Sequence, residues 1–326
     1  MEKIIPSKLQ KGDKVMVVAP SRGLKLIGQD CRQIAEERLR QMGLEVVFAP
    51  NTIDENWDAV GSWKATARAA DLMTAFADKT VKAIFTVIGG FNSNQILPLL
   101  DFDIIRANPK IFCGFSDITA LHAAINAKTG LETYYGPHYS SIGMKHGCEY
   151  TLDYLQKMLF SDAPVEINPS AEWSDDLWFI DQEKRTFMPN DGFWNIHNGK
   201  ASGTIVGGNL CTFNLLLGTD MRPAFKQDTI LMVEDDAGSS AAVFDRNLQA
   251  LCYQPDFKNV KGLVIGRFQK DSQINREALE LIINNKPELK NIPVLANVDY
   301  GHATPIITIP LGGRATLDNG KLTLEK

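Results

Sequence analysis

The chain has 326 residues and a formal net charge of −5 at pH 7, and it is 44% hydrophobic and 22% charged, as is common in soluble globular proteins. This length is sufficient to bury a large core, and it favours two domains. The negative net charge gives no reason to expect nucleic acid or an anionic membrane surface as a partner.

The amino-terminal stretch MEKIIPSKLQKGDKV contains no apolar run long enough for a secretory signal. No stretch of the chain approaches the roughly 18 apolar residues that a membrane span requires. The five cysteines are scattered and include no CxxC pair. This pattern indicates a cytoplasmic location and argues against both a disulfide framework and a thiolate zinc site.

Short apolar runs alternate with helical patterns through the first half of the chain. We predict strands over 14–20, 44–50, 81–90 and 110–115, and helices over about 28–42, 64–79, 92–100 and 117–128. The alternation predicts a parallel sheet with helices on both sides, as in flavodoxin- or Rossmann-like folds. Ligands bind such sheets at the carboxyl ends of the strands, where Gly89, Gly90 and Ser116 fall. Asn92 is the predicted cap of the helix that follows the glycines.

The character of the sequence changes between residues 162 and 200, which are rich in Pro, Asp, Asn and Trp and show little periodicity. We therefore predict an α/β domain over 1–165, a linker with an aromatic loop over 166–200, and a β-rich α+β domain over 201–326. For the last domain the pattern predicts strands over 229–235 and 260–268, helices near 239–252 and 274–286, and several short β segments after them.

Ser116 lies where a predicted strand gives way to a helix, in the stretch KIFCGFSDITALHAAI. A sharp turn there would lift its hydroxyl out of the sheet, as in a nucleophile elbow, and the N–H of Asp117 would point at a developing oxyanion. The loop of Gly89 and Gly90 can bring a second backbone donor close. Ser and Asp are also the usual helix caps, and the stretch lacks the common GxSxG pattern, so a cap and a nucleophile both remain open.

A nucleophilic serine needs a base, normally histidine. Among the five histidines, His122 is on the helix that follows Ser116 and points away from it, while residues 146 and 197 fall in polar turns. His138 is possible. His302 lies on a loop after the strand-like PVLANV, and loops on a rigid frame are where catalytic groups usually reside.

The base in turn needs an orienting carboxylate. Glu234 follows four apolar residues at the end of a predicted strand, where a buried acid requires a partner. The neighbouring Asp235 and Asp236 could serve equally well, and the alternatives to any such role are a solvated acidic turn and a metal-binding loop that lacks its other ligands.

Seven stretches in the same order along nearly the whole chain resemble the LD-carboxypeptidase family of serine peptidases, and more closely its microcin C immunity (MccF-type) branch. They are LQKGDKVMVVAPS, RAADLMTAFAD, IGGFNSNQILPLLDFDII, NPKIFCGFSDITALHAAINAKTGLETYYGPH, GKASGTIVGGNLCTFNLLLGT, ILMVEDD and DYGHATPIITIPLGG. Seven collinear matches are far more specific than one short motif.

The resemblance implies a Ser-His-Glu triad that is divided between an amino-terminal α/β domain and a carboxyl-terminal β-rich domain. Residue by residue, it makes Ser116 the nucleophile, His302 the base and Glu234 the carboxylate. The amides of Gly90 and Asp117 become the oxyanion donors. With the resemblance we favour the nucleophile over the cap for Ser116.

The resemblance also implies the chemistry, which is amide hydrolysis by a serine-type carboxypeptidase or amidase without a metal or organic cofactor. In MccF-type enzymes, which provide self-immunity or detoxification, the bond joins a peptidyl or aminoacyl group to a nucleotide-like moiety. LD-carboxypeptidases instead remove the terminal D-alanine of the murein tetrapeptide, which is the alternative activity. The family suggests a homodimer, and neither nucleic acid nor a membrane is an expected partner.

Several residues are candidates for substrate contacts. Phe91 and Phe115 stand where such proteins often carry Tyr, so any hydroxyl contact from these positions is lost. The aromatic loop could stack on a nucleobase, because an aromatic face binds any base, or it could pack the linker against the body. The candidates for these contacts, each equally compatible with a structural role, are Trp178 and Trp194 for stacking, and Asn209, Arg246, Gln269 and Arg267 for a carboxylate or phosphate.

Two other functional classes stay open. A non-catalytic protein that binds a small molecule is possible, because two α/β-containing lobes also suit ligand capture. A dinucleotide-dependent enzyme, suggested by Gly89 and Gly90, is disfavoured because no GxGxxG fingerprint opens a helix and the first strand is followed by APSRG.

Overall fold

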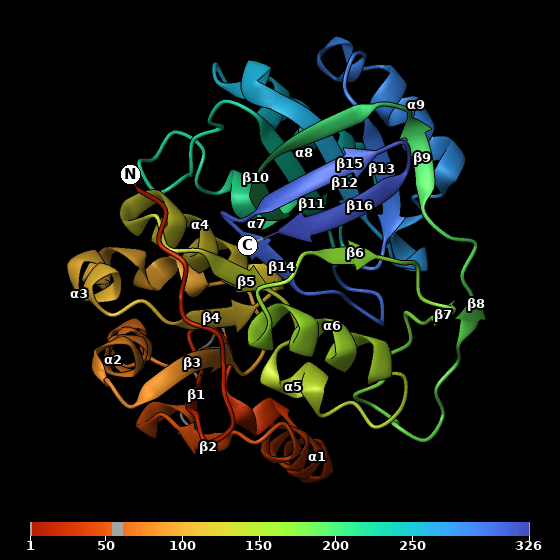
Figure 1. Cartoon of the computed structure of the whole chain (residues 1–326). Coiled ribbons are helices and arrows are strands. Elements are labelled where there is room, and N and C mark those ends of the chain that lie inside the picture. Colours follow the sequence, from red (N-terminus) through yellow and green to blue (C-terminus); the bar gives the residue numbers. More distant parts are fainter. Residues whose placement is uncertain (1, 54–60, 326) are drawn as a thin grey trace.

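The structure is a computed structural model that describes residues 2–53 and 61–325. Figure 1 shows two sheets in separate halves of the molecule, the first in the red-to-yellow half and the second in the green-to-blue half. The predicted class, an α/β domain followed by a β-rich unit, is confirmed.

The first sheet has six strands in the order β14-β5-β4-β3-β1-β2. Its five amino-terminal strands are parallel, and β14 is antiparallel to β5. Inner strands of a parallel sheet are covered on both faces, which explains why β3 and β4 are almost continuously apolar. The bounds are β1 (Lys14–Val18), β2 (Glu45–Phe48), β3 (Val81–Thr86), β4 (Ile111–Gly114), β5 (Thr133–Tyr135) and β14 (Ile309–Leu311).

Helices flank this sheet at the predicted places. In α2 the buried residues Ala69, Leu72 and Phe76 recur at helical spacing, so one face of the helix packs on the sheet. The predicted helix over 92–100 is a 3-10 helix, Ser93–Leu99, which contains Pro98. No prediction covered α3, β5, α5 or α6. The helices are α1 (Gln29–Gln41), α2 (Ala65–Ala77), α3 (Phe102–Ala107), α4 (Thr119–Thr129), α5 (Tyr139–Ile142) and α6 (Glu149–Phe160).

The second sheet has eight strands in the order β6-β16-β15-β10-β11-β12-β13-β9. The four strands from β10 to β13 are parallel, and the outer ones are antiparallel. The strands are β6 (Val165–Ile167), β9 (Trp194–His197), β10 (Lys200–Asn209), β11 (Thr229–Glu234), β12 (Val260–Gly266), β13 (Val294–Val298), β15 (Arg314–Asp318) and β16 (Lys321–Glu325). The helices are α7 (Leu210–Asn214), α8 (Ala241–Cys252) and α9 (Arg276–Asn284), and a small separate sheet pairs β7 (Glu172–Trp173) with β8 (Met188–Pro189).

The two halves of the molecule are joined by strands that pair with the sheet of the other half and by a shared apolar core. β14, from the end of the chain, joins the first sheet beside β5, as Figure 1 also shows, while β6 joins the second sheet through β16. Leu121 of α4 and Phe213 of α7 belong to the same buried apolar cluster. The predicted boundaries at 165 and 201 stay predictions, and the interleaved strands indicate that neither half is self-contained.

Three further features bear on function. None of the helices within residues 2–53 and 61–325 combines the length and the apolar character of a membrane span. Within the same residues, no three or more His, Cys, Asp or Glu side chains are grouped to hold a metal ion. All five cysteines are free thiols.

A buried ion pair anchors the linker to the second sheet. The Asp299 carboxylate, which is fully buried, accepts hydrogen bonds from the Ser170 amide at 2.7 Å, the Ser170 hydroxyl at 2.9 Å and Nη2 of Arg267 at 2.9 Å. Arg267 also donates from Nη1 to Asn297 at 2.8 Å. Removing one partner of such a pair leaves an uncompensated charge in the interior.

We therefore expect Asp299→Ala to lower the free energy of unfolding by roughly 3–5 kcal/mol, because the Arg267 guanidinium would stay buried without its carboxylate. Urea denaturation followed by circular dichroism measures the change. Glu280→Ala, which breaks the exposed pair with Arg276, is the control and should cost less than about 1 kcal/mol. Equal losses in the two variants would contradict the role assigned to the buried pair.

Candidate active site

Ser116, His302 and Glu234 form a continuous chain of hydrogen bonds. Nε2 of His302 lies 2.9 Å from the Ser116 hydroxyl, and its Nδ1 lies 2.7 Å from Oε2 of Glu234. Ser116 follows β4 of the first sheet, whereas Glu234 ends β11 and His302 follows β13 of the second. The three residues that the sequence singled out therefore meet where the carboxyl ends of both sets of parallel strands come together.

The backbone at Ser116 is a sharp turn. Its φ of +61° lies in the left-handed region, which non-glycine residues seldom adopt and which costs on the order of 1–3 kcal/mol. The Ser116 N–H donates to the hydroxyl of Tyr135 at 2.9 Å. A short 3-10 turn, Ser116–Ile118, then leads directly into α4. The partly exposed Ser116 side chain therefore sits on a tight strand-to-helix turn of the kind that a nucleophile elbow requires.

Glu234 is fully buried and has three hydrogen-bond donors around it. Besides His302, the Tyr135 hydroxyl donates to Oε1 at 2.6 Å and Nδ2 of Asn209 donates to the same oxygen at 3.2 Å. Burial by itself would raise the pKa of Glu234, but His302 and these two donors outweigh it and hold the pKa below its ordinary value. The carboxylate therefore stays ionised in the interior.

The same balance acts on His302 with the opposite sign. Burial lowers its pKa, but the charge and hydrogen bond of Glu234 outweigh burial and leave the pKa above its ordinary value. The side chain keeps 18% of its surface exposed, so it can reach a substrate. The Phe115 ring packs edge-on against the imidazole, with centroids 5.4 Å apart.

Gly301 allows the loop of His302 to pass close to Glu234. Its φ is +111°, and a Cβ at this position would lie 2.4 Å from Oε2 of Glu234. Any side chain would therefore collide with the carboxylate that His302 must reach. The glycine in YGHATP is required by this approach.

The side chain of Asp117 holds the loop of Gly90 against the turn of Ser116. Its Oδ2 accepts hydrogen bonds from the Ser21 hydroxyl at 2.6 Å and from the amides of Asn92 and Ser93 at 3.0 and 2.9 Å. Asn92 is the N-cap residue, as predicted, but its side chain makes no capping hydrogen bond. The amides at this helix start are satisfied by a carboxylate that is distant in sequence.

The backbone N–H groups of Gly90 and Asp117 donate to no atom of the residues that the structure describes. Gly90 packs tightly, because a Cβ there would lie 2.2 Å from the Ser21 hydroxyl. The Ser116 N–H is already used by Tyr135. Gly90 and Asp117 thus stay candidates for the oxyanion donors, together with Gly89, whose N–H is also unused among the described residues and where a Cβ would lie 3.1 Å from the Ser116 hydroxyl.

A pocket of about 300 Å³, which we call the Ser116 pocket, opens over the hydroxyl. Of the predicted contact residues, Trp178 and Gln269 line it. Its mouth carries exposed apolar side chains, Phe91, Leu177 and Phe179. The full lining is Arg22, Ile88, Gly89, Gly90, Phe91, Phe115, Ser116, His138, Ser140, Ser141, Asp176, Leu177, Trp178, Phe179, Asp236, Gln269 and His302.

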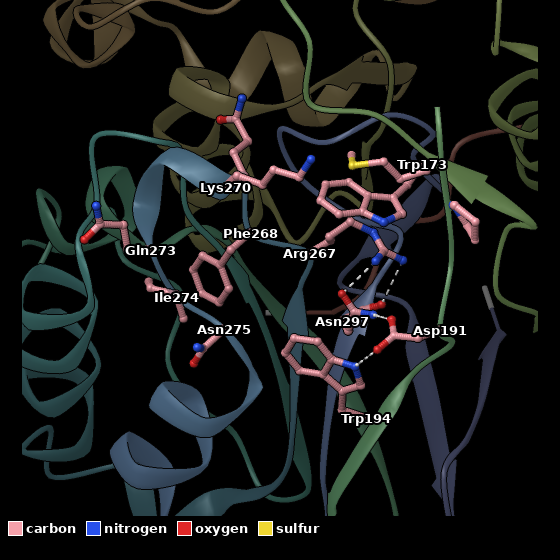
Figure 2. A pocket seen from close by; sticks show the side chains of 13 residues that line it. Trp173, Asp191, Trp194, Arg267, Phe268, Lys270, Gln273, Ile274, Asn275 and Asn297 are labelled. Carbon is pink, nitrogen blue, oxygen red and sulfur yellow. Dashed lines mark hydrogen bonds between the residues drawn. The ribbon is translucent and has the colours of Figure 1, made fainter. Parts of the chain in front are cut away.

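The other predicted contact residues lie elsewhere. Figure 2 shows Trp194 and Arg267 around a second cavity of about 570 Å³, which shares Gln269 with the Ser116 pocket but has neither Ser116 nor His302 in its wall. Asn209 points inward to Glu234, so it supports the carboxylate instead of facing the pocket. Arg246 is exposed on α8 and is absent from the lining of both cavities.

The remaining histidines are accounted for by other contacts. Nε2 of His122 is 2.9 Å from the Gly114 carbonyl, and burial lowers its pKa to about 4. Burial, and then the proximity of His302, lower the pKa of His138, whose Nδ1 lies 2.7 Å from the Thr86 hydroxyl. His197 is in strand β9 instead of the predicted turn. His146 is exposed near Glu183.

Tyr135 and Arg22 were missed by the sequence analysis. Tyr135 connects the Ser116 amide to Glu234, but β5 is three residues long and carries too little pattern to identify it. Arg22 lies in APSRG after the first strand, at the edge where ligands bind, and that position was the available signal.

Comparison with known proteins gives matches over both halves of the chain. The model described as LD-carboxypeptidase N-terminal domain matches residues 15–136, and the model described as LD-carboxypeptidase C-terminal domain matches residues 202–317. The first span contains Gly90, Ser116 and Asp117, and the second contains Glu234 and His302.

Whole-chain relatives agree with these matches. A Bacillus subtilis (strain 168) protein named "Putative carboxypeptidase YocD" is 46% identical over 312 residues, which cover 96% of this chain and 95% of the relative. A second protein of that strain, named "Probable murein peptide carboxypeptidase", is 30% identical over 325 residues, 98% of this chain and 92% of the relative.

Solved structures are similar over the whole chain as well. A crystal structure of an MccF-like protein from Bacillus anthracis str. Ames has a TM-score of 0.96 and 47% identity, and covers 99% of both chains. A structure of MccF in complex with glutamyl sulfamoyl guanosine has a TM-score of 0.88 and 28% identity, and covers 98% of both chains.

The link through Tyr135 predicts that Tyr135→Phe slows the reaction of Ser116 with a fluorophosphonate probe by roughly 10- to 100-fold, because one hydrogen bond to a buried charge is lost. Mass spectrometry of the labelled peptide measures the rate. Tyr134→Phe is the matched control, since that buried hydroxyl donates to Glu132. A rate for Tyr135→Phe equal to that of the control would contradict the assigned link.

The raised pKa of His302 predicts how labelling depends on pH. The imidazole must be neutral to take the serine proton, so the rate should fall as pH drops through a midpoint above the ordinary value of about 6.5. Glu234→Gln removes the charge that raises this pKa, so the midpoint should move to lower pH. The plateau should also fall by roughly 10³-fold, because the imidazole loses its orienting partner.

Asp318→Asn, at an exposed acid that pairs with Lys200, should leave both the midpoint and the plateau unchanged. A midpoint for Glu234→Gln at or above that of the unmodified protein would show that Glu234 does not set the pKa of His302.

Proposed function

This chain belongs to the LD-carboxypeptidase family, and we propose that it is a Ser-His-Glu hydrolase that cleaves the amide-type bond between a peptidyl or aminoacyl group and a nucleotide-like moiety. That it is an enzyme of the serine hydrolase class follows from the family and its carboxypeptidase relatives. The observation that carries the proposed mechanism is the hydrogen-bonded chain from Ser116 through His302 to Glu234, beside two unused backbone donors.

The first half of the reaction forms an acyl-enzyme. Nε2 of His302 takes the proton of the Ser116 hydroxyl, and the oxygen attacks the carbonyl carbon of the scissile bond. The developing oxyanion is bound by the N–H groups of Gly90 and Asp117, each worth on the order of 3 kcal/mol of barrier. His302 then gives its proton to the leaving nitrogen, and Glu234 stabilises the imidazolium while it exists.

The second half repeats these steps with water. His302 removes a proton from a water molecule, which attacks the acyl carbon, and the Ser116 oxygen leaves with that proton. No step of this scheme calls for a metal or an organic cofactor, because charge develops only where the backbone donors and the imidazole already lie.

The choice of a nucleotide-like leaving group rests on two observations. MccF, to which the chain is similar over its whole length, has been solved with glutamyl sulfamoyl guanosine and with aspartyl sulfamoyl adenosine. In this chain Trp178 lines the Ser116 pocket, and the neighbouring Leu177 and Phe179 are 57% and 66% exposed. Exposed apolar side chains around a pocket suit a flat ring, and an indole face stacks on any base.

The loop that carries Trp178 is held next to His302. Ser174 and Thr304 exchange two backbone hydrogen bonds of 2.7 Å, so the aromatic segment begins at a fixed distance from the base. A ring stacked on Trp178 would then lie in the same pocket as the reacting hydroxyl. Trp194, which lines the other cavity, has no part in this proposal.

Removal of the terminal D-alanine from the murein tetrapeptide is the second candidate function. It is favoured by the family name and by the Bacillus subtilis relative that is named for murein peptides. The same triad and donors would serve both reactions, since both break the bond between an acyl carbon and a nitrogen. The homodimer and the cytoplasmic location stay predictions.

One assay separates the two reactions. The protein is incubated with an aminoacyl-sulfamoyl adenosine and, separately, with L-Ala-D-Glu-m-DAP-D-Ala, and chromatography measures the released nucleoside or D-alanine. We expect release from the nucleoside compound, with Ser116→Ala lowering the rate by roughly 10⁴-fold or more.

Cleavage of the tetrapeptide alone would overturn the proposed leaving group and establish the second candidate. If neither compound is cleaved and Ser116 fails to react with a fluorophosphonate that labels a known serine hydrolase, the protein is a binder of small molecules instead.

A further inference from the structure

We propose that Arg22 forms an anion-binding subsite in the Ser116 pocket, for a negatively charged group on the leaving part of the substrate. The inference rests on the proposed function, because it concerns the substrate of the same site. Arg22 is the one lysine or arginine among the described residues that line this pocket.

The loop that carries Arg22 is rigidly held at the carboxyl end of β1. The buried Arg68 donates from Nη1 to the Pro20 carbonyl at 2.6 Å, and the Ser21 hydroxyl donates to Asp117 at 2.6 Å. β1 is the neighbour of β3, which leads to Gly90, and β4, which leads to Ser116, is the next strand. Three adjacent strand ends therefore deliver the arginine, the oxyanion loop and the nucleophile to one edge of the sheet.

The side chain of Arg22 lies directly beside the oxyanion loop. A Cβ at Gly90 would lie 3.1 Å from its Cγ, and its guanidinium carbon is 5.2 Å from the centre of the Phe91 ring. The Phe91 ring is 76% exposed. An aromatic face orients a guanidinium but leaves its N–H groups unused, so they remain available to a ligand.

The charge of Arg22 is not compensated by any of the residues that the structure describes. The half-buried guanidinium has no carboxylate partner and donates no hydrogen bond to residues 2–53 or 61–325. Asp176, an acid in the same lining, is already held by Arg185 at 2.7 Å and 2.9 Å. A cation that is partly removed from water and unpaired favours an anionic ligand, and an arginine fork binds oxyanions at two points.

The other side of the pocket repels an anion. Asp236, which comes from the second sheet, lines the pocket and follows the buried Glu234 and Asp235. Burial, and then the charge of Glu234, raise the pKa of Asp235 to about 7, so Glu234 and Asp236 carry the negative charge of that side and direct the charged end of a substrate to the first sheet. Arg22 thus sets the direction in which a substrate lies across Ser116.

The chemistry shared by the candidate substrates agrees with this position. A terminal amino acid carries its carboxylate one carbon beyond the scissile nitrogen, and a nucleotide conjugate carries a phosphoryl or sulfamoyl group bonded to that nitrogen. In both, the anion belongs to the leaving part and lies within a few bonds of the oxyanion. An uncharged leaving group would leave Arg22 unpaired.

The test compares two substrate pairs, in each of which the anionic member carries a negative charge on its leaving part and the neutral member does not. One pair is L-Ala-D-Glu-m-DAP-D-Ala and its C-terminal carboxamide. The other is an aminoacyl-sulfamoyl adenosine and the corresponding 5′-aminoacylamino-5′-deoxyadenosine, which lacks the sulfamoyl group. The variants are Arg22→Gln, Arg22→Lys and, as a control, Lys25→Gln, at an exposed residue outside the pocket lining.

We expect Arg22→Gln to lower kcat/KM for the anionic member by roughly 10- to 100-fold, mainly through KM, and to change the neutral member by less than about threefold. Arg22→Lys should restore part of the loss, and Lys25→Gln should change nothing. If Arg22→Gln lowers kcat/KM selectively for the anionic peptide, the bound anion is a carboxylate. If it does so for the sulfamoyl adenosine, the bound anion is a sulfamoyl- or phosphoryl-type group. Equal effects on both members of a pair, or none, overturn the subsite.

Failure of the proposed function can be distinguished from failure of the Arg22 subsite. If the unmodified protein cleaves none of the four compounds, the hydrolase proposal fails, and calorimetry on Ser116→Ala tests Arg22 by binding alone. Tighter binding of the anionic member than of the neutral one, lost when Arg22→Gln is added, supports the subsite. Equal affinity for both members, or no binding of either, overturns it.

Discussion

The Glu234 carboxylate, which has no exposed surface, is the constraint on which the rest of the site depends. An ionised group in the interior costs several kcal/mol unless it is paired and hydrogen-bonded. His302, Tyr135 and Asn209 supply those contacts, and each is held in place by a different strand end. The charge therefore draws together parts of both sheets. It also keeps His302 basic enough to accept a proton, so one buried acid accounts for the geometry and for the pKa of the base.

Tyr135 makes the position of Ser116 depend on that of Glu234. Its hydroxyl accepts a hydrogen bond from the Ser116 amide and donates one to Glu234. One oxygen atom therefore connects the turn at Ser116 to the second sheet. Asp117 plays a comparable part within the first sheet, where its carboxylate binds the amides that follow the Gly90 loop. The Gly90 loop, Ser116 and His302 are thus held by buried polar contacts and not by the exposed loops themselves, which fits the proposed catalytic site being preorganised before substrate arrives.

Sequence patterns predicted the alternating first sheet and the separate roles of Ser116, Glu234 and His302, because apolar runs and strand-end positions are local signals. Sequence patterns predicted side-chain roles less well where the contacts come from residues distant in sequence. Asn92 is a residue type that commonly caps helices, yet the Asp117 carboxylate accepts the backbone hydrogen bond at that helix start. Asn209 lies at a strand end like a ligand-binding residue, yet the burial of Glu234 turns its amide inward. Trp178 and Trp194 share one aromatic segment, but the Ser174–Thr304 bridge and strand β9 send them to different cavities.

By itself, the sequence determined that a serine, a histidine and an acid stand at strand ends in a two-sheet α/β protein. Hydrophobic periodicity and the residues that interrupt it are properties of neighbouring residues, so the sequence alone contains them. Tertiary structure alone decided that these three residues meet, that Tyr135 joins two of them, and that Arg22 has no counter-charge among the residues that the structure describes. Those facts depend on contacts between residues about 20 to 190 positions apart. Such contacts arise only when the ends of two separate sheets are packed face to face, and no local pattern encodes that distance.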